Sequence, residues 1–335
     1  MRKRVYIALA VLLVMLAGVI GWQGLREREP VYQGKRLSRW VKDYALVFRL
    51  PPNAAPSTPN ADEAVRQIGT NAIPTLLRML RAKDSPLKDK LVALAQRQHI
   101  IKIEYTPAEQ WNGAAPFAFG VLGAKAQSAV PALIEIANRN ISFDSQSSAI
   151  MALGFIGPSA KEAVPSLPGW ATNANAEVRE ISIIGLGEIG AEPDRVVPAL
   201  IHALHDPDAE VQGKAAWALG KLRPDAKVAV PALVEFLKDT RADEQADRLR
   251  AIEALGFIGP SAKEAVPSLL EWATNADPNV RHYAIEALGE IHAELGRVVP
   301  VLIRALQDPE PWVRPYATNA LKAIDPEAAA KAGVK

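Results

Sequence analysis

The stretch ALGFIGPSAKEAVPSL, at residues 152–167, occurs again without change at residues 254–269. The offset is 102 residues, and flanking sequence repeats at the same offset: RVVPALIHAL at 195–204 returns as RVVPVLIRAL at 297–306. A run of 16 identical residues at a fixed offset indicates an internal duplication. Duplicated supersecondary units stack on one another in repeat proteins. The sequence therefore predicts a stacked array.

A shorter period lies within the duplication. The motif [AV]-V-P-x-L recurs in steps of 33 to 36 residues, with its proline at Pro131, Pro165, Pro198, Pro231, Pro267 and Pro300. Each unit reads as two amphipathic helices joined by a polar turn, and neither helix can bury its apolar stripe alone. Stacked neighbours must complete the core. We predict an all-α α-solenoid, a right-handed superhelix of helical hairpins, over residues 61–325, with a tail at 326–335.

The first part of the array departs from this period. The step from Pro74 to the next motif proline is 57 residues, so residues 83–123 form an irregular unit. A helix is expected to begin after Thr106, with Thr106 and Glu109 as a capping box. The departure is either a packing adaptation near the end of the array or a functional insertion.

Glycine recurs at one position near the end of successive second helices, at Gly154, Gly187, Gly220, Gly256 and Gly289. Glycine in a helix interior lowers stability by roughly 1 kcal/mol relative to alanine. Its recurrence at one repeat position therefore indicates that a neighbouring helix approaches closely there.

The N-terminus predicts a membrane anchor. The basic residues 1–4 precede 18 uncharged residues, 5–22, which as a helix would span about 27 Å, close to the thickness of a bilayer core. Basic residues favour the cytoplasmic side. We therefore expect a single-pass protein with a cytoplasmic N-terminus and an array on the periplasmic side. The alternative is a cleaved signal peptide, in which case the chain is secreted.

Residues 23–60 connect the anchor to the array. They contain GKRLSRWVKDYALVF at 34–48, a short amphipathic helix by its spacing, and a Pro-rich linker at 51–60. The apolar face of this helix consists of Leu37, Trp40, Val41, Tyr44 and either Ala45 or Phe48. The helix either caps the array or places its basic residues on anionic lipid headgroups.

The charge distribution and the amino-acid composition argue against a nucleic-acid partner and against cysteine-based sites. Residues 1–60 carry ten Lys/Arg and three Asp/Glu of the chain's 39 and 37, so the array is mildly acidic. A nucleic-acid partner is therefore not expected, because such binders carry a basic folded surface. The chain has no cysteine, which excludes disulfides, thiolate zinc sites and a cysteine nucleophile.

The histidines do not predict a metal site. His202 and His205 have the i, i+3 spacing of a metal pair, but their counterparts in the second copy are Arg304 and Gln307. A metal site would not vary in this way, so we predict solvated positions. No His-Glu dipeptide and no Gly-rich phosphate loop occurs. The sequence predicts neither an enzyme nor a cofactor.

The pattern VPALIxAL…D-P-x-x-x-V-R-x-x-A-x-x-ALGxIG resembles HEAT repeats, in the variety first described in phycobilisome bilin lyases, over residues 61–325. The N-terminal plan, a hydrophobic helix followed by YQGKRLSRW and EAVRQIGTNAIPTLL, is similar to that of bacterial membrane-anchored HEAT-repeat proteins of unassigned role. The resemblance implies a membrane-anchored scaffold for protein–protein interaction outside the cytoplasm. A bilin-lyase-like enzyme or enzyme subunit is the alternative.

HEAT repeats usually carry an Asp in the turn and an Arg six residues later, and the resemblance carries this pair over to Asp308 and Arg314. The arginines at this repeat position are Arg179, Arg248, Arg281 and Arg314. They are candidates for a row that binds an acidic protein partner. Alternatively, each binds turn oxygens of its own or the adjacent unit. Arg248 has Ala242 where the acid belongs, so its guanidinium is expected to be free.

Overall fold

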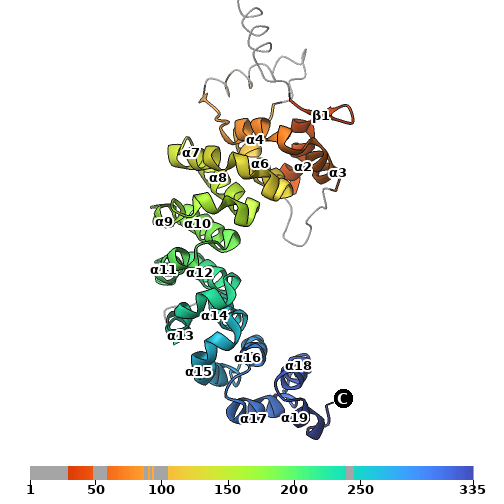
Figure 1. The fold of residues 1–335 in the computed structure, drawn as a ribbon, viewed down its shortest axis with the longest axis vertical. Helices are drawn as coiled ribbons and strands as arrows, with labels where there is room; N and C mark the ends of the chain where they lie inside the picture. Colours follow the sequence, from red (N-terminus) through yellow and green to blue (C-terminus); the bar gives the residue numbers. More distant parts are fainter. Residues whose placement is uncertain are drawn as a thin grey trace, which may run out of the picture.

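The computed structural model describes residues 29–47, 59–86, 90, 93, 105–238 and 245–334. It is a curved stack of helical pairs, as Figure 1 shows, which confirms the predicted α-solenoid. The predicted anchor at 5–22 and nearly all of the linker at 51–60 lie outside the described residues.

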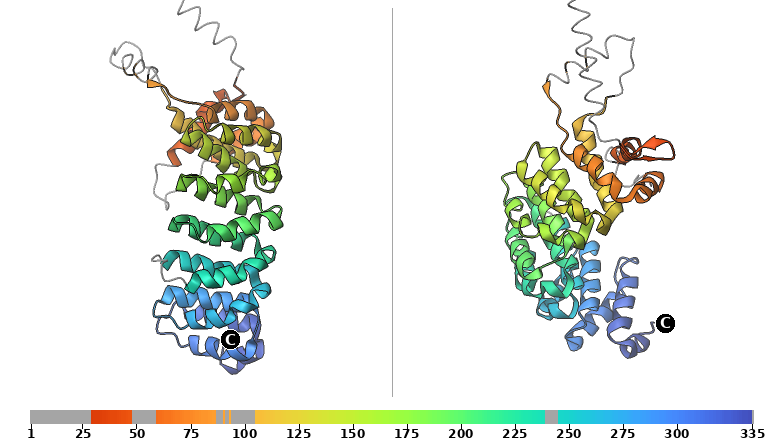
Figure 2. Two further views of the ribbon diagram at one scale, coloured as in Figure 1. Left: turned by 90° about the vertical axis from the view of Figure 1, so that its left-hand side faces the viewer. Right: turned by 45° about the horizontal axis from the view of Figure 1, so that its top comes forward.

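Each unit pairs an outer helix with an inner helix. The outer helices are α4 (Ile73–Leu80), α7 (Val130–Arg139), α9 (Leu167–Trp170), α11 (Pro193–Ala203), α13 (Val230–Lys238), α15 (Val266–Trp272) and α17 (Leu295–Ala305). The inner helices are α6 (Ala108–Leu122), α8 (Phe143–Ile156), α10 (Ala176–Ile189), α12 (Ala209–Lys221), α14 (Gln245–Ile258), α16 (Pro278–Ile291) and α18 (Arg314–Ile324). Successive inner helices pack directly on one another, whereas successive outer helices touch little (Figures 1 and 2). The inner helices therefore form the concave surface.

Short 3-10 helices join the pairs. They are η1 (Gly69–Ala72), η2 (Gly123–Ala129), η3 (Gly157–Ala163), η4 (Arg223–Ala229) and η5 (Gly259–Ala265). The chain leaves an inner helix at positive φ, 71° at Gly157 and 70° at Gly259, a conformation that glycine adopts without a Cβ clash. The motif proline is the second residue of α7, α13 and α15, where no amide hydrogen is needed. In α11 and α17 the helix begins earlier, and Pro198 and Pro300 lie inside it.

The N-terminal end is closed by a hairpin and two helices. The strands β1 (Val31–Tyr32) and β2 (Lys35–Arg36) pair antiparallel, and α2 (Leu37–Val47) and α3 (Pro59–Ile68) follow. The helix α2 packs on α3 and α6 and buries Leu37, Trp40, Val41 and Tyr44 of the predicted apolar face. The hydroxyl of Tyr44 donates a hydrogen bond of 2.6 Å to Asp62 of α3. Thus α2 caps the first inner helix.

At the other end, residues 326–335, which the sequence sets apart as a tail, begin with a helix. The helix α19 (Pro326–Lys331) follows α18 directly and packs on it, and Ala329 is buried. The carboxylate of Asp325 accepts the N–H of Ala328 at 2.9 Å, so a local N-cap starts this last helix. The array thereby ends on a helix that covers the last inner helix.

The capping box predicted for Thr106 is also wrong. The helix α6 begins at Ala108 without a side-chain cap from its own residues. The N–H of Ala108 donates instead to the carboxylate of Asp84 at 2.6 Å, and the Asn112 amide donates to carbonyls at the end of α4 at 2.7 and 3.0 Å. These long-range bonds seat α6 beside α4, where it acts as an ordinary inner helix.

Among the described residues, one stretch is apolar and long enough to cross a membrane by length and composition, Ala108–Arg139. It comprises α6, η2 and α7. Both α6 and α7 pack against α4 and α8. The apolar side chains of this stretch therefore belong to the core of the array.

The recurring glycines lie where inner helices approach most closely. A Cβ on Gly289 would lie 2.7 Å from the Cβ of Ala320, and one on Gly187 would lie 2.8 Å from the Cβ of Ala218. A Cβ on Gly220 would lie 2.9 Å from the Cα of Ala254. The close approach predicted from the sequence is confirmed.

The substitution Gly220→Ala is expected to lower the free energy of unfolding by about 1–3 kcal/mol. The new methyl group would meet backbone, which cannot rotate away as a flexible side chain could. The matched control is Gly296→Ala in α17, where the added methyl group meets nothing within 4 Å and helix propensity improves by up to about 1 kcal/mol. Chemical denaturation of both variants measures the difference, and equal effects would contradict the packing argument.

Candidate functional site

The four candidate arginines lie along one edge of the concave surface, near the first turn of their inner helices: Arg179 in α10, Arg248 in α14, Arg281 in α16 and Arg314 in α18. Because the inner helices stack in register, the repeat position common to these arginines forms a row. The contacts within the row decide which of them are available to a partner.

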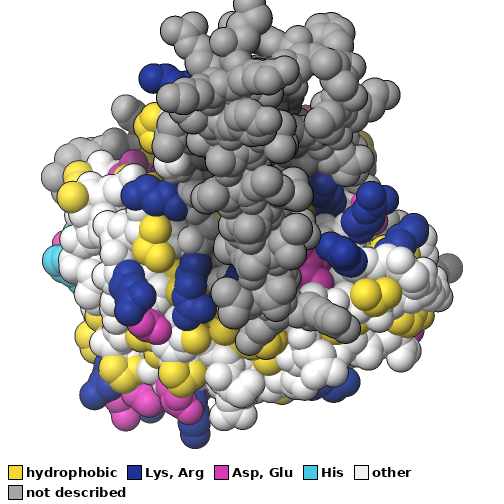
Figure 3. Space-filling model, turned by 90° about the horizontal axis from the view of Figure 1, so that it is seen from above, with side chains coloured by type: hydrophobic (Ala, Val, Ile, Leu, Met, Phe, Trp, Pro, Cys, Tyr) yellow, Lys and Arg dark blue, Asp and Glu magenta, His cyan; other side chains and the backbone are white. Residues whose placement is uncertain are grey.

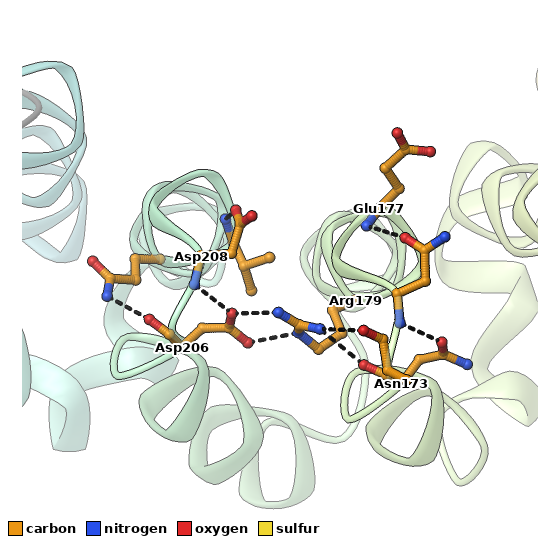
Figure 4. Close-up of polar contacts among 9 residues, drawn as sticks. Asn173, Glu177, Arg179, Asp206 and Asp208 are labelled. Carbon is orange, nitrogen blue, oxygen red and sulfur yellow. Dashed lines mark hydrogen bonds and ion pairs between the residues drawn. The ribbon is translucent and has the colours of Figure 1, made fainter.

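Arg179 joins two successive units (Figure 4). Its Nε donates to Asp206 Oδ2 at 2.8 Å and its Nη2 donates to Asp206 Oδ1 at 2.7 Å. Its Nη1 donates to the backbone carbonyl of Asn173 in its own turn at 2.9 Å. The two side chains are only 12% and 9% exposed, so this bidentate pair is part of the packing between units.

The same arrangement occurs 102 residues later. Arg281 donates to both oxygens of Asp308 at 2.8 and 2.7 Å and to the carbonyl of Asn275 at 2.9 Å. The hydrogen bond from Arg281 lowers the pKa of the Asp308 carboxyl below its ordinary value. Hydrogen bonds to their aspartates likewise raise the pKa of Arg179 and Arg281. Two of the four arginines are thus committed to the fold.

The predicted pair between Asp308 and Arg314 is wrong. The carboxylate of Asp308 is taken by Arg281 of the preceding unit, and Arg314 Nε donates instead to the backbone carbonyl of Asp308 at 2.8 Å. The side-chain amide of Gln212 likewise donates a hydrogen bond of 2.6 Å to the backbone carbonyl of Asp206. At Asp206 and Asp308, therefore, the side chain six residues later bonds the backbone carbonyl of the aspartate. The carboxylate of the aspartate binds the arginine of the preceding unit.

Arg248 differs from its counterparts. Its guanidinium carbon lies 5.9 Å from the ring centroid of Trp272, at the distance of a cation–π contact. Ala242 lies outside the described residues. Arg248 makes contacts within the chain, so the prediction that its guanidinium is free is wrong. Binding of an acidic partner by these four arginines stays a prediction.

The C-terminal end of the concave surface is aromatic and acidic. The ring of His282 in α16 lies 3.8 Å from that of Tyr316 and 5.7 Å from that of Trp312, measured between centroids, and its Nε2 lies 3.4 Å from Glu286. Burial lowers the pKa of His282, against a smaller opposite effect of Glu286. Burial and the nearby Glu286 raise the pKa of Glu253. Trp312 remains 42% exposed, available for contact.

The described residues contain no group of three or more His, Asp or Glu side chains that could hold a metal ion. His202, in α11, and His205, just after it, are exposed, as expected for solvated positions. Trp170 is buried and its Nε1 donates to the side chain of Asn138 at 3.1 Å, so it serves packing.

One feature of the concave surface was missed from the sequence. A hollow of about 400 Å³ lies between α6, α8 and α10, with Ser147 and Ser148 among its lining residues. Comparison of the two copies could have found it, because the second copy has the larger Leu249 and Arg250 at these positions.

A family model described as HEAT repeats matches residues 167–255, 240–295 and 266–332. No curated protein matches the chain. Among solved structures, Kap121p bound to Pho4p aligns with 86% of this chain and 33% of its own, at 16% identity and a TM-score of 0.56. Kap121p bound to Nup53p gives 15% identity and the same TM-score and coverage. The chain thus spans a third of the length of these structures, and the likeness concerns the fold.

An archaeal HEAT-like repeats protein from Thermococcus onnurineus NA1 is also similar, at 19% identity, over 58% of this chain and 80% of that one, with a TM-score of 0.42.

Proposed function

Because the chain is a HEAT-repeat protein, we propose that it is an interaction scaffold, tethered to a membrane by residues 5–22, that holds a protein partner outside the cytoplasm. The observation that carries this proposal is the concave surface. Its inner helices, α6 to α18, pack one on the next and form a continuous curved wall (Figure 1). Such extended surfaces suit solenoids to binding other proteins.

The structural neighbours support a protein partner. Kap121p, which shares the solenoid fold, has been described bound to Pho4p and to Nup53p. In this chain the concave wall offers exposed aromatic surface at Trp312 and exposed carboxylate at Glu286, a combination suited to protein contact.

The N-terminal cap supports a membrane tether. Lys35, Arg36 and Arg39 are exposed on β2 and α2, at the end of the array to which residues 1–28 connect. Seen from above in Figure 3, Lys and Arg side chains lie on the visible surface around this end. Basic residues are attracted to anionic lipid headgroups. The cap would therefore rest favourably on a membrane.

Single cysteines test location and surface together, because the natural chain has none. We expect Tyr283→Cys on α16 and Ile303→Cys on α17 both to react with a membrane-impermeant maleimide photocrosslinker in intact spheroplasts. After illumination, only the inner position, Tyr283→Cys, should crosslink a partner. Ile303 is the matched control because it is 41% exposed on an outer helix.

Each part of the proposal has its own contrary outcome. Labelling that requires lysis would refute the location outside the cytoplasm. Equal partner crosslinking from both positions would refute the concave surface as the binding site. A mature chain that begins near residue 22 on N-terminal sequencing would replace the tether by secretion.

A further inference from the structure

The hollow between α6, α8 and α10 has an acidic rim. Its carboxylates, Glu109, Asp144 and Glu177, lie in the first turns of the three helices. None of the ion pairs found between described residues involves these three carboxylates. The rim therefore presents negative charge that the described part of the chain leaves uncompensated.

The interior of the hollow combines apolar surface with a buried hydroxyl. Phe143, Met151 and Ile181 supply the apolar wall. Ser147 also lines the hollow, is 6% exposed, and its Oγ has no hydrogen-bond partner in the described structure. Burial of an unpaired hydroxyl is unfavourable. The hydroxyl would gain a partner if a ligand with hydrogen-bond donors entered.

The second copy shows what fills the equivalent place. The helix α14 repeats α8 at an offset of 102 residues, so Arg250 stands where α8 has Ser148. Arg250 Nη1 lies 2.7 Å from Asp247 Oδ1 and 3.6 Å from Glu210 Oε2 of the preceding inner helix α12. In the second copy, therefore, a guanidinium from the chain itself bridges two successive inner helices.

A glycine stands at this place in both copies. The 3-10 helices that follow α6 and α12 each begin at a residue with positive φ, Gly123 in η2 and Arg223 in η4. When the two helices are aligned at these residues, Gly113, which lines the hollow, corresponds to Gly213. A Cβ on Gly213 would collide with the side chains of Asp247 and Arg250, so glycine makes the room that the guanidinium occupies.

We propose that the hollow in the first copy binds an arginine side chain of the protein partner, in the place that Arg250 fills from within the second copy. The inference rests on the proposed function, since the arginine belongs to the partner on the concave surface. The aliphatic stem would pack on the apolar wall, and the planar guanidinium would bond the rim carboxylates and Ser147 Oγ. A volume of about 400 Å³ is at the small end for ligand sites, in keeping with one side chain.

The test uses the full chain and three blocked pentapeptides, Gly-Gly-X-Gly-Gly, with X arginine, citrulline or lysine. Citrulline keeps the shape of arginine and removes its charge. Binding measured by nuclear magnetic resonance titration should be saturable for the arginine peptide in the millimolar range and at least about tenfold weaker for citrulline. Lysine should bind more weakly than arginine, because an ammonium cannot bond two carboxylates in a fork.

Two variants locate the binding. Ser148→Arg should occupy the hollow from within, as Arg250 does, and abolish binding of the arginine peptide. Glu177→Gln keeps the volume of the side chain and removes its charge, so it should weaken binding of the arginine peptide several-fold. This variant provides the test if Ser148→Arg does not fold. Equal binding of arginine and citrulline peptides, or binding unchanged in both variants, would overturn the proposal. So would a partner crosslinked at Tyr283→Cys whose capture Ser148→Arg leaves unchanged, whereas no crosslinked partner at all would count against the proposed function.

Discussion

Asp308→Ala is expected to lower the free energy of unfolding of the last units by about 3–5 kcal/mol, the range for removing one partner of a buried ion pair. Asp308 is 5% exposed and accepts two hydrogen bonds from Arg281 and one from the N–H of Glu310. Its loss leaves the guanidinium of Arg281 buried with only backbone carbonyls. Hydrogen exchange across α16 to α18 is the suitable measurement, because it reports the stability of these units separately, and repeat arrays need not unfold in a single step.

Matched variants separate the ion pair from general effects. Asp206→Ala should cost a similar amount at the equivalent junction with Arg179. Glu327→Ala, which breaks an exposed pair with Lys331, should change stability by no more than about 0.5 kcal/mol. The double variant Arg281→Ala/Asp308→Ala should lose less than the sum of the two single variants, because the partners are coupled. Additive losses would show that the pair itself contributes nothing.

The same pair predicts a pH dependence. The pKa of Asp308 is lower in the folded chain than in the unfolded chain, so the unfolded chain binds the proton more readily. The contribution of Asp308 is therefore fully present above its unfolded pKa and is lost as the pH falls below about 4. The stability difference between the natural chain and Asp308→Ala should shrink over that range. A difference that stays constant down to pH 2 would contradict the assignment.

The architecture could be predicted because its signals are local or periodic. The motif prolines and the recurring glycines each report one position in every unit. A Cβ on Gly187, Gly220 or Gly289 would clash with the next inner helix, so the glycine row reports a contact that each unit repeats. The face of α2 was predictable for the same reason, since four apolar residues at helical spacing require something to cover them.

The predictions that were wrong concern hydrogen bonds whose partner lies in another part of the array. Asp308 and Arg314 are six residues apart, yet the carboxylate binds Arg281, 27 residues before it. Ala108 takes its cap from Asp84, 24 residues before it, rather than from Thr106. Sequence spacing describes contacts within one helix or turn, and these contacts cross between units. The hollow was missed because an unfilled volume leaves no motif, and its one trace in the sequence is the pair of small residues Ser147 and Ser148 where the second copy has Leu249 and Arg250.

Leu255→Ala is expected to lower the local free energy of unfolding by about 2–5 kcal/mol. Leu255 lies in the repeated stretch on α14 and is fully buried, as is its counterpart Leu153 on α8. Removal of the side chain exposes no new surface to water but leaves a cavity between helices that can close only in part. Since Leu153 occupies the same repeat position 102 residues earlier, Leu153→Ala should give a loss of similar size.

The comparison of these two leucines also tests whether the array unfolds as one body. In a chain of units that touch only their neighbours, each substitution should loosen its own unit and the adjoining ones. Hydrogen exchange should therefore rise around α14 in Leu255→Ala and around α8 in Leu153→Ala, with little change at the other site. Leu295→Ala, on a side chain that is 42% exposed, is the control and should stay within about 0.5 kcal/mol of the natural chain. Equal loosening of both sites by either variant would show a cooperative body, and no loosening by either would show that the helical phase of the repeat is wrong.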